Sequence, residues 1–97
     1  MRPVTLADLE VAARALLAMP KAARAVAARE LLAEAAAADR HRLATRRLHP
    51  HFGDGTLMAA AMQRPLAPRP ATIDAAAIRV FVLLLNEIGQ VMQYHGN

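Results

Sequence analysis

Apolar and polar positions alternate with the period of an α-helix, most clearly between residues 73 and 94. Spacings of three and four residues align one set of large apolar side chains along a helix: Ile78, Phe81, Leu85, Ile88 and Met92. Three more widen this set into a face: Ala77, Leu84 and Val91. Others lie on the opposite side: Val80, Val82 and Leu83. A helix that is apolar on both sides is predicted to be central in the fold, to pair with a copy of itself, or both.

Proline and glycine positions delimit the earlier helices. Thr5 is a suitable N-cap and Asp8 stands at the capping-box position, so a helix is expected over residues 6–18, ended by Pro20. The next helix is expected over residues 21–47, where ~1.5 Å per residue gives roughly 40 Å. Its alanine-rich sequence has high helix propensity. Its larger apolar residues share one broad side: Val26, Leu32 and Leu43.

The loop that follows has a definite turn chemistry. Either glycine, Gly53 or Gly55, can adopt a positive φ angle, and Asp54 or Thr56 can cap the next helix. His49 and Pro50 complete this structural loop. The remaining elements are a short helix over 56–63, a proline-rich extended linker over 64–71, and the helix over 73–94. The chain, residues 1–97, is thus predicted to be one all-α domain of three to four helices with a helical hairpin core.

Composition limits the chemistry. The 97 residues contain no cysteine and only 3% aromatic residues, which excludes disulfides and thiolate metal sites and implies a thin core of closely packed helices. Serine is absent too, and no pair of carboxylates accompanies a suitable acid or base, so no enzymatic activity and no cofactor are expected. The longest wholly apolar run, Val80–Leu85, is shorter than a bilayer requires. A cytoplasmic protein without a membrane role is expected.

Positive charge is concentrated in the first half of the chain. Residues 1–51 hold nine basic and five acidic residues, whereas the remainder is balanced. Because guanidinium groups bind phosphate through paired hydrogen bonds, the basic residues of the second helix are candidates for contacts with a nucleic-acid backbone. These are Lys21, Arg24, Arg29, Arg40, Arg42, Arg46 and Arg47. The alternative is a solvated helix face, with its positive field reduced by Glu30, Glu34 and Asp39.

Other candidate sites are weaker. A helix-turn-helix around Pro20 is disfavoured because the second helix is too long for a recognition helix. His49 and His51, near His41 and Asp54, lack the helical spacing that presents two metal ligands together, so no metal site is expected. His49 is expected instead to cap carbonyls at the end of the second helix, with His51 facing solvent.

Two stretches resemble a known family. Residues 49–58, His-Pro-His-Phe-Gly-Asp-Gly-Thr-Leu-Met, and the opening Met-Arg-Pro-Val-Thr-Leu-Ala-Asp-Leu-Glu resemble short alanine- and arginine-rich proteins of alphaproteobacterial gene transfer agents. The likeness covers nearly the whole chain. In that family the protein's place resembles that of a small terminase subunit of a DNA-packaging machine.

This resemblance implies a homo-oligomeric helical protein that binds DNA without sequence preference and recruits the large terminase subunit, for which residues 90–97 are a candidate segment. Small terminases commonly have an N-terminal helix-turn-helix, and this sequence departs from that pattern. Two other functional classes stay open. One is a phage-derived structural or adaptor protein with no nucleic-acid role, and the other is a small helical transcription regulator.

Overall fold

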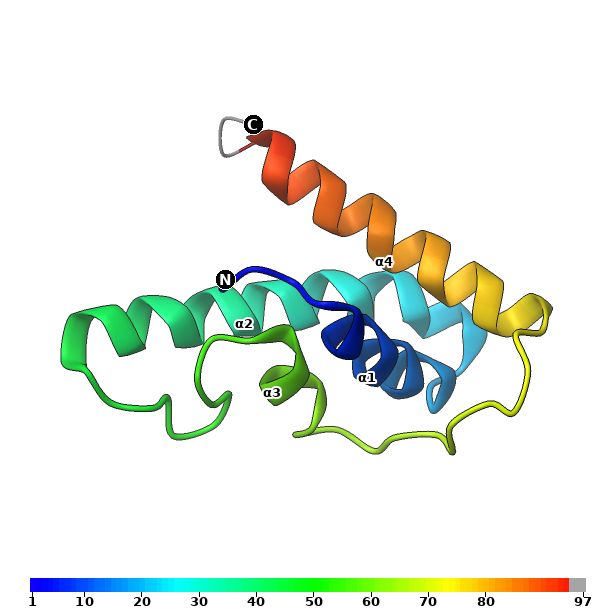
Figure 1. Cartoon of the computed structure of the whole chain (residues 1–97), viewed down its shortest axis with the longest axis horizontal. Coiled ribbons are helices and arrows are strands. Elements are labelled where there is room, and N and C mark those ends of the chain that lie inside the picture. The colour runs from blue at the N-terminus through cyan, green and yellow to red at the C-terminus, as the bar shows by residue number, and fades with distance from the viewer. Residues whose placement is uncertain (95–97) are drawn as a thin grey trace.

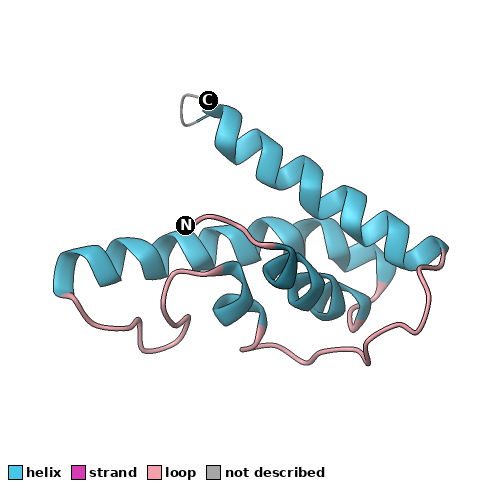
Figure 2. Cartoon of the chain, viewed as in Figure 1, coloured by secondary structure: helices cyan, strands magenta, loops and turns pink. Residues whose placement is uncertain are grey.

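The computed structural model describes residues 1–94 and is all-helical (Figures 1 and 2). Its elements are α1 (Leu6–Leu17), a 3₁₀ turn η1 (Lys21–Ala23), α2 (Arg24–Thr45), α3 (Leu57–Ala61) and α4 (Ala75–Tyr94). Among the described residues there is no strand, only an isolated antiparallel bridge between His49 and Gly53. The predicted all-α fold, with its long second helix and its C-terminal helix, is confirmed. Helix ends differ from prediction by up to three residues.

Helix α1 begins with the predicted capping box. The Asp8 amide donates to Thr5 Oγ1 at 3.1 Å, and the Thr5 amide donates to Asp8 Oδ2 at 2.7 Å. Asp8 is also only 4% exposed, and its Oδ1 accepts a hydrogen bond from the Met58 amide in the first turn of α3 at 3.0 Å. One carboxylate therefore caps its own helix and joins it to another that lies 50 residues further along the chain.

Helix α2 packs through small residues. Its buried side consists of alanine and leucine only: Ala27, Ala28, Leu31, Leu32, Ala35 and Ala38. Of the side predicted from Val26, Leu32 and Leu43, Leu32 is buried, whereas Val26 and Leu43 are exposed. The helix ends at Thr45, two residues earlier than predicted, because Arg46 adopts a left-handed conformation with φ of 60°.

Helix α4 crosses α1 and α2 with its first half and rises away from α2 toward its C-terminal end (Figure 1). It buries Ala77, Val80, Leu84 and Ile88, while Phe81, Leu83 and Val91 are partly buried against the core. The predicted seam is therefore rotated: of its members, Ile78, Leu85 and Met92 are about half exposed. Val80 and Val82, predicted on the opposite side together, are separated, since Val80 is buried and Val82 is half exposed beside Ile78 and Leu85. Ala77 and Val80 on this buried side are smaller than Ile78 and Leu85, which suits packing against the alanine-rich surfaces of α1 and α2.

The connection between α3 and α4 is extended, as its prolines predict, and arginines hold it against the helices. Ala67 and Arg14 exchange two hydrogen bonds, from the Ala67 amide to the Arg14 carbonyl at 3.0 Å and from Arg14 Nε to the Ala67 carbonyl at 2.8 Å. Arg64 binds Glu30 and Glu34 of α2 at 3.1 and 3.0 Å. Arg69 forms an ion pair with Glu10 of α1. The long connection is therefore fixed on the surface of the helical core.

Candidate nucleic-acid interface

Three arginines lie exposed at the C-terminal end of α2, and we call them the arginine tip: Arg40, Arg46 and Arg47. None has a carboxylate within salt-bridge distance among residues 1–94. The left-handed turn at Arg46 redirects the chain at the end of the helix. A helix C-terminus is the negative end of the helix dipole, so any anion bound here would depend on the guanidinium groups themselves.

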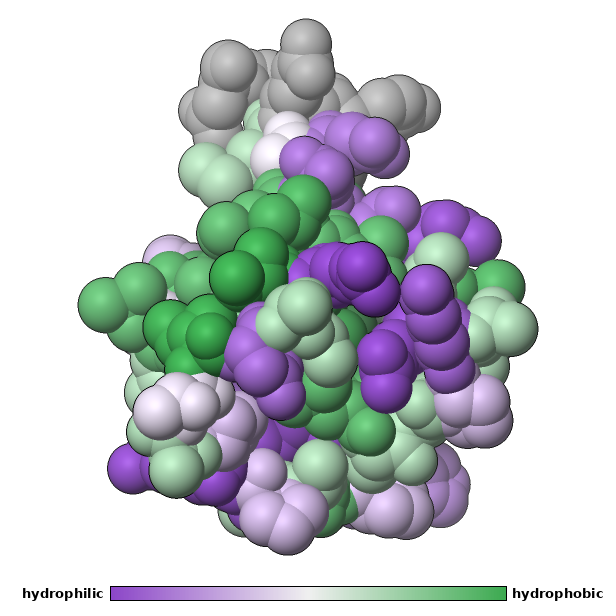
Figure 3. Space-filling view, turned by 90° about the vertical axis from the view of Figure 1, so that its right-hand side faces the viewer, coloured by the Kyte–Doolittle hydropathy of each residue, from purple (hydrophilic) through white to green (hydrophobic). Residues whose placement is uncertain are grey.

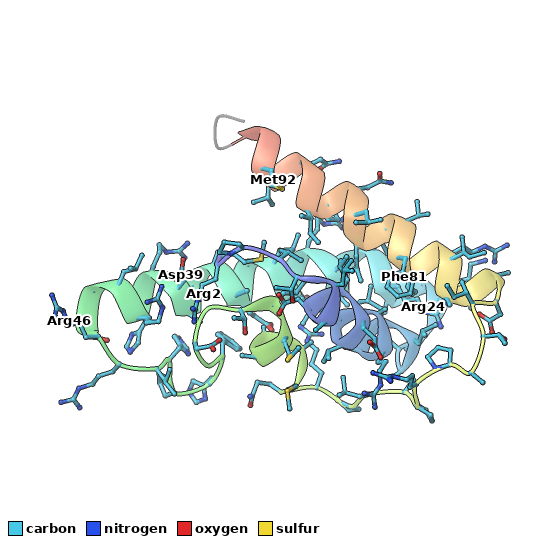
Figure 4. All side chains as sticks on the ribbon, in the orientation of Figure 1. Arg2, Arg24, Asp39, Arg46, Phe81 and Met92 are labelled. Atoms are coloured by element: carbon cyan, nitrogen blue, oxygen red, sulfur yellow. The ribbon has the colours of Figure 1, made fainter. Side chains whose placement is uncertain are left out.

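The other predicted basic residues do not join this tip. Arg24 Nε donates to the carbonyls of Leu16 and Met19 at 3.0 and 3.2 Å, which closes the end of α1. Arg29 lies 3.6 Å from Glu87 of α4. Lys21 precedes α2 and is exposed, but it lies at the opposite end of that helix. Figure 4 shows Arg24 and Arg46 at opposite ends of the molecule. The seven residues therefore do not form one continuous surface.

Arg42 occupies an intermediate position. Its guanidinium binds Asp39 Oδ1 at 2.8 Å, and this hydrogen bond is the main cause that holds the pKa of Asp39 below its usual value. It also lines an open hollow of about 530 Å³ at the end of α2, together with Leu43, Arg46, Arg47 and Leu48. Leu43 and Leu48 are 67% and 65% exposed. The surface at the C-terminal end of α2 thus combines cationic and apolar side chains.

A histidine-rich loop adjoins the arginine tip. His49 Nδ1 accepts hydrogen bonds from the amides of His51 and Phe52, both at 3.1 Å, and its ring stacks on Phe52 with centroids 4.8 Å apart. The prediction that His49 caps carbonyls of the second helix is wrong: Nδ1 accepts from two amides of its own loop, and His49 donates no hydrogen bond to a carbonyl of α2 among the described residues. Burial, and then the nearby His41 and His51, lower the pKa of His49.

Two glycines shape this loop, Gly53 beside Ala59 of α3 and Gly55 against α2. Gly53 and Gly55 have φ angles of 81° and 92°. A Cβ atom at Gly55 would lie 2.8 Å from the Cα of Asp39, so only glycine allows the loop to approach the helix this closely. Asp54 accepts from the amide and hydroxyl of Thr56 at 3.0 and 2.7 Å, and this lowers the pKa of Asp54. Arg2 and Asp39 lie beside this loop in Figure 4.

Two other properties bear on function. No group of three or more side chains suited to a metal ion occurs in the part of the chain that the structure describes. Residues Ala75–Met92 of α4 are long and apolar enough, by length and composition alone, to cross a membrane, a test that core helices of soluble proteins also pass. For the candidate partner segment 90–97, residues 95–97 lie outside the described residues.

Comparison with known proteins identifies a family of unknown function. A family model described as a domain of unknown function, DUF7742, matches residues 2–88. No curated protein and no solved structure matches the chain. Because the match spans most of the 97 residues, the chain belongs to the DUF7742 family.

Proposed function

We propose that this protein contacts the DNA backbone through the arginine tip and acts, without catalysis, as a small terminase-like subunit of a gene transfer agent or phage DNA-packaging machine. The observation that supports the DNA contact is that some arginines bind groups within the fold while others are left exposed. Arg14, Arg24 and Arg64 bind carbonyls or carboxylates within the fold, whereas Arg40, Arg46 and Arg47 are exposed. The packaging role, with the large terminase subunit as partner, follows from the sequence resemblance.

Contacts of this kind would be insensitive to base sequence. Recognition helices place their N-terminal residues against base edges in the major groove. The arginine tip lies at the C-terminal end of a 22-residue helix, which suits phosphate contacts better than base contacts. This argues against the transcription-regulator alternative. A packaging machine that accepts any DNA would need no sequence readout by this subunit.

The test is DNA binding by fluorescence anisotropy at several salt concentrations. The double variant Arg46→Gln/Arg47→Gln should bind more weakly to every duplex, and its slope of log affinity against log salt should be shallower by about two, one unit per lost phosphate contact. The matched control, Lys21→Gln/Arg79→Gln, removes the same charge from exposed sites away from the tip. Equal losses in both variants would reduce the effect to net charge and contradict the proposal.

An adaptor function is the second candidate, and one observation favours it. Leu43 and Leu48 lie exposed beside Arg46 and Arg47 around one hollow, a mixture that suits an acidic, partly apolar protein segment. If the wild-type protein does not bind DNA even at low salt, this candidate replaces the first.

A further inference from the structure

Helix α4 carries a second apolar row on the side that faces away from the core. We call it the outer stripe: Ile78, Val82, Leu85, Gly89 and Met92. Its four large side chains are 52%, 51%, 53% and 52% exposed, respectively. Polar residues border it on one side, namely Arg79, Asn86 and Gln90. Figure 3 shows hydrophobic side chains gathered in a band along this part of the molecule, with hydrophilic side chains beside it.

The fold does not require this row. The core of the domain is closed by the other side of α4, through Ala77, Val80, Leu84 and Ile88. Exposed apolar surface that is continuous and bordered by polar residues is typical of an interaction site. The spacings of the stripe, four, three, four and three residues, repeat every seven residues, which is the period at which two helices keep one seam in contact.

The order of residues within the stripe points to a second copy of the same chain. Ile78 and Met92 stand seven residues before and after Leu85, and Val82 and Gly89 stand three before and four after. When two such helices run antiparallel about Leu85, Val82 of each lies within one residue, ~1.5 Å along the axis, of the level of Gly89 of the other. No atom lies within 4 Å of where a Cβ of Gly89 would be, so the branched side chain has space there. The stripe is therefore self-complementary, as a two-fold interface requires.

Charge favours the same arrangement. Arg79 is the one charged residue on the exposed side of α4 within residues 75–92. In an antiparallel pair, the two Arg79 side chains lie about 18 Å apart along the axis, at ~1.5 Å per residue. In a parallel pair they would lie side by side and repel each other. Antiparallel helices also align their dipoles favourably.

We propose that two copies of this chain pair through the outer stripes of their α4 helices, antiparallel and centred on Leu85, with Val82 packed against Gly89 of the other copy. This inference is independent of DNA binding. Because the arginine tips lie on α2, away from the outer stripe, both remain accessible in the pair.

The first test is mass as a function of concentration, by sedimentation equilibrium or light scattering. The wild type should show a monomer–dimer equilibrium, and Leu85→Asp should shift its midpoint at least tenfold toward monomer while helical content is unchanged. Asn86→Asp is the matched control, since it adds the same charge at the neighbouring exposed position outside the stripe. Gly89→Leu is a second variant that raises helix propensity and so keeps the fold, yet fills the space that Val82 of the partner copy needs.

Cysteine cross-linking tests the direction, because the chain contains no cysteine. Under oxidation, Leu85→Cys should cross-link to itself, whereas Ile78→Cys should cross-link to Met92→Cys in a mixture and not to itself. Self-cross-linking of Ile78→Cys would show a parallel pair and overturn the proposal.

Three further outcomes would also overturn it. These are a wild type that stays monomeric at all concentrations, a dimer that Leu85→Asp and Gly89→Leu leave intact, and a monomer whose α4 binds lipid vesicles through Leu85. The last result would make lipid the occupant of the stripe. A dimer indifferent to DNA contradicts only the proposed function, and a monomer that binds DNA contradicts only the pairing, so the two failures are distinguishable.

Discussion

Asp8 does more than cap helix α1, because it also binds α3. Its two carboxylate oxygens accept three hydrogen bonds, from the amide and hydroxyl of Thr5 and from the Met58 amide of α3. It is buried, so removing the carboxylate leaves two amide donors without a partner in a place where water has little access. The residue therefore stabilises the junction between α1 and α3 as well as the start of α1.

We expect Asp8→Ala to lower the free energy of unfolding by about 2 kcal/mol, because it removes both a cap and a tertiary hydrogen bond. Urea denaturation followed by circular dichroism measures this. Asp74→Ala is the comparison, since the exposed Asp74 accepts one hydrogen bond, from the Ala77 amide, and should cost about 1 kcal/mol. Equal losses from the two substitutions would mean that the bond to α3 contributes nothing.

The loop formed by residues 49–55 is the element whose stability should respond to pH near neutrality. His49 Nδ1 can accept hydrogen bonds only while it is unprotonated. The pKa of His49 is lowered in the folded protein, so the unfolded state binds more protons below the ordinary value of 6.5. The stabilisation from this residue is therefore present above pH 6.5 and is lost as the pH falls through the lowered pKa.

Replacing His49 by asparagine tests this directly. The Oδ1 atom of asparagine stands at the same distance along the side chain as Nδ1 of histidine and accepts hydrogen bonds at every pH of interest. We expect His49→Asn to flatten the fall in thermal midpoint between pH 7 and about pH 5, the range in which histidine titrates. His51→Asn should keep most of the wild-type slope, since the His51 amide still donates to His49 Nδ1 and burial lowers the pKa of His49 more than His51 does. A slope unchanged in His49→Asn would place the pH dependence elsewhere.

At the level of elements, features set by local residue preferences could be predicted from the sequence, whereas features set by tertiary packing could not. The capping box at Thr5 and Asp8, the glycine turn and the proline-rich connection follow from residue types with specific backbone preferences. The buried side of α4 could not be read in the same way. Both sides of that helix are apolar, and the choice of Val80 and Leu84 over Ile78 and Leu85 depends on the shape of the surface beneath. For α2, alanine on all sides leaves almost no periodic signal.

The candidate site was predicted only in part, for a related reason. A sequence shows where arginines lie along a helix but not which carbonyls or carboxylates other segments bring to them. Arg24 and Arg29 belong to the same basic stretch as Arg40 and Arg47, yet the end of α1 and Glu87 of α4 occupy the first two. The interaction of Arg14 with Ala67, 53 residues away, had no signal in the local pattern.

At the scale of the whole molecule, the two proposals predict a joint effect. A pair of chains would present two arginine tips, and simultaneous contact of both with one DNA molecule raises the apparent affinity without any new contact. Leu85→Asp should therefore weaken binding to long duplexes by tenfold or more, and should leave binding to a duplex too short for two tips nearly unchanged. Anisotropy titrations with both duplex lengths measure this, with Asn86→Asp as the control. An equal loss on both lengths would mean that Leu85 affects the tip itself.

The left-handed conformation of Arg46 has a consequence for the evolution and engineering of this protein. A residue with a side chain in this conformation costs roughly 1–2 kcal/mol, whereas glycine adopts it freely. In a domain whose total stability is on the order of 5–15 kcal/mol, that cost is appreciable. Glycine at this position would give a more heat-resistant protein with one fewer positive charge at the end of α2. Position 46 can therefore favour either thermal stability, with glycine, or positive charge at the end of α2, with arginine. The natural sequence has arginine.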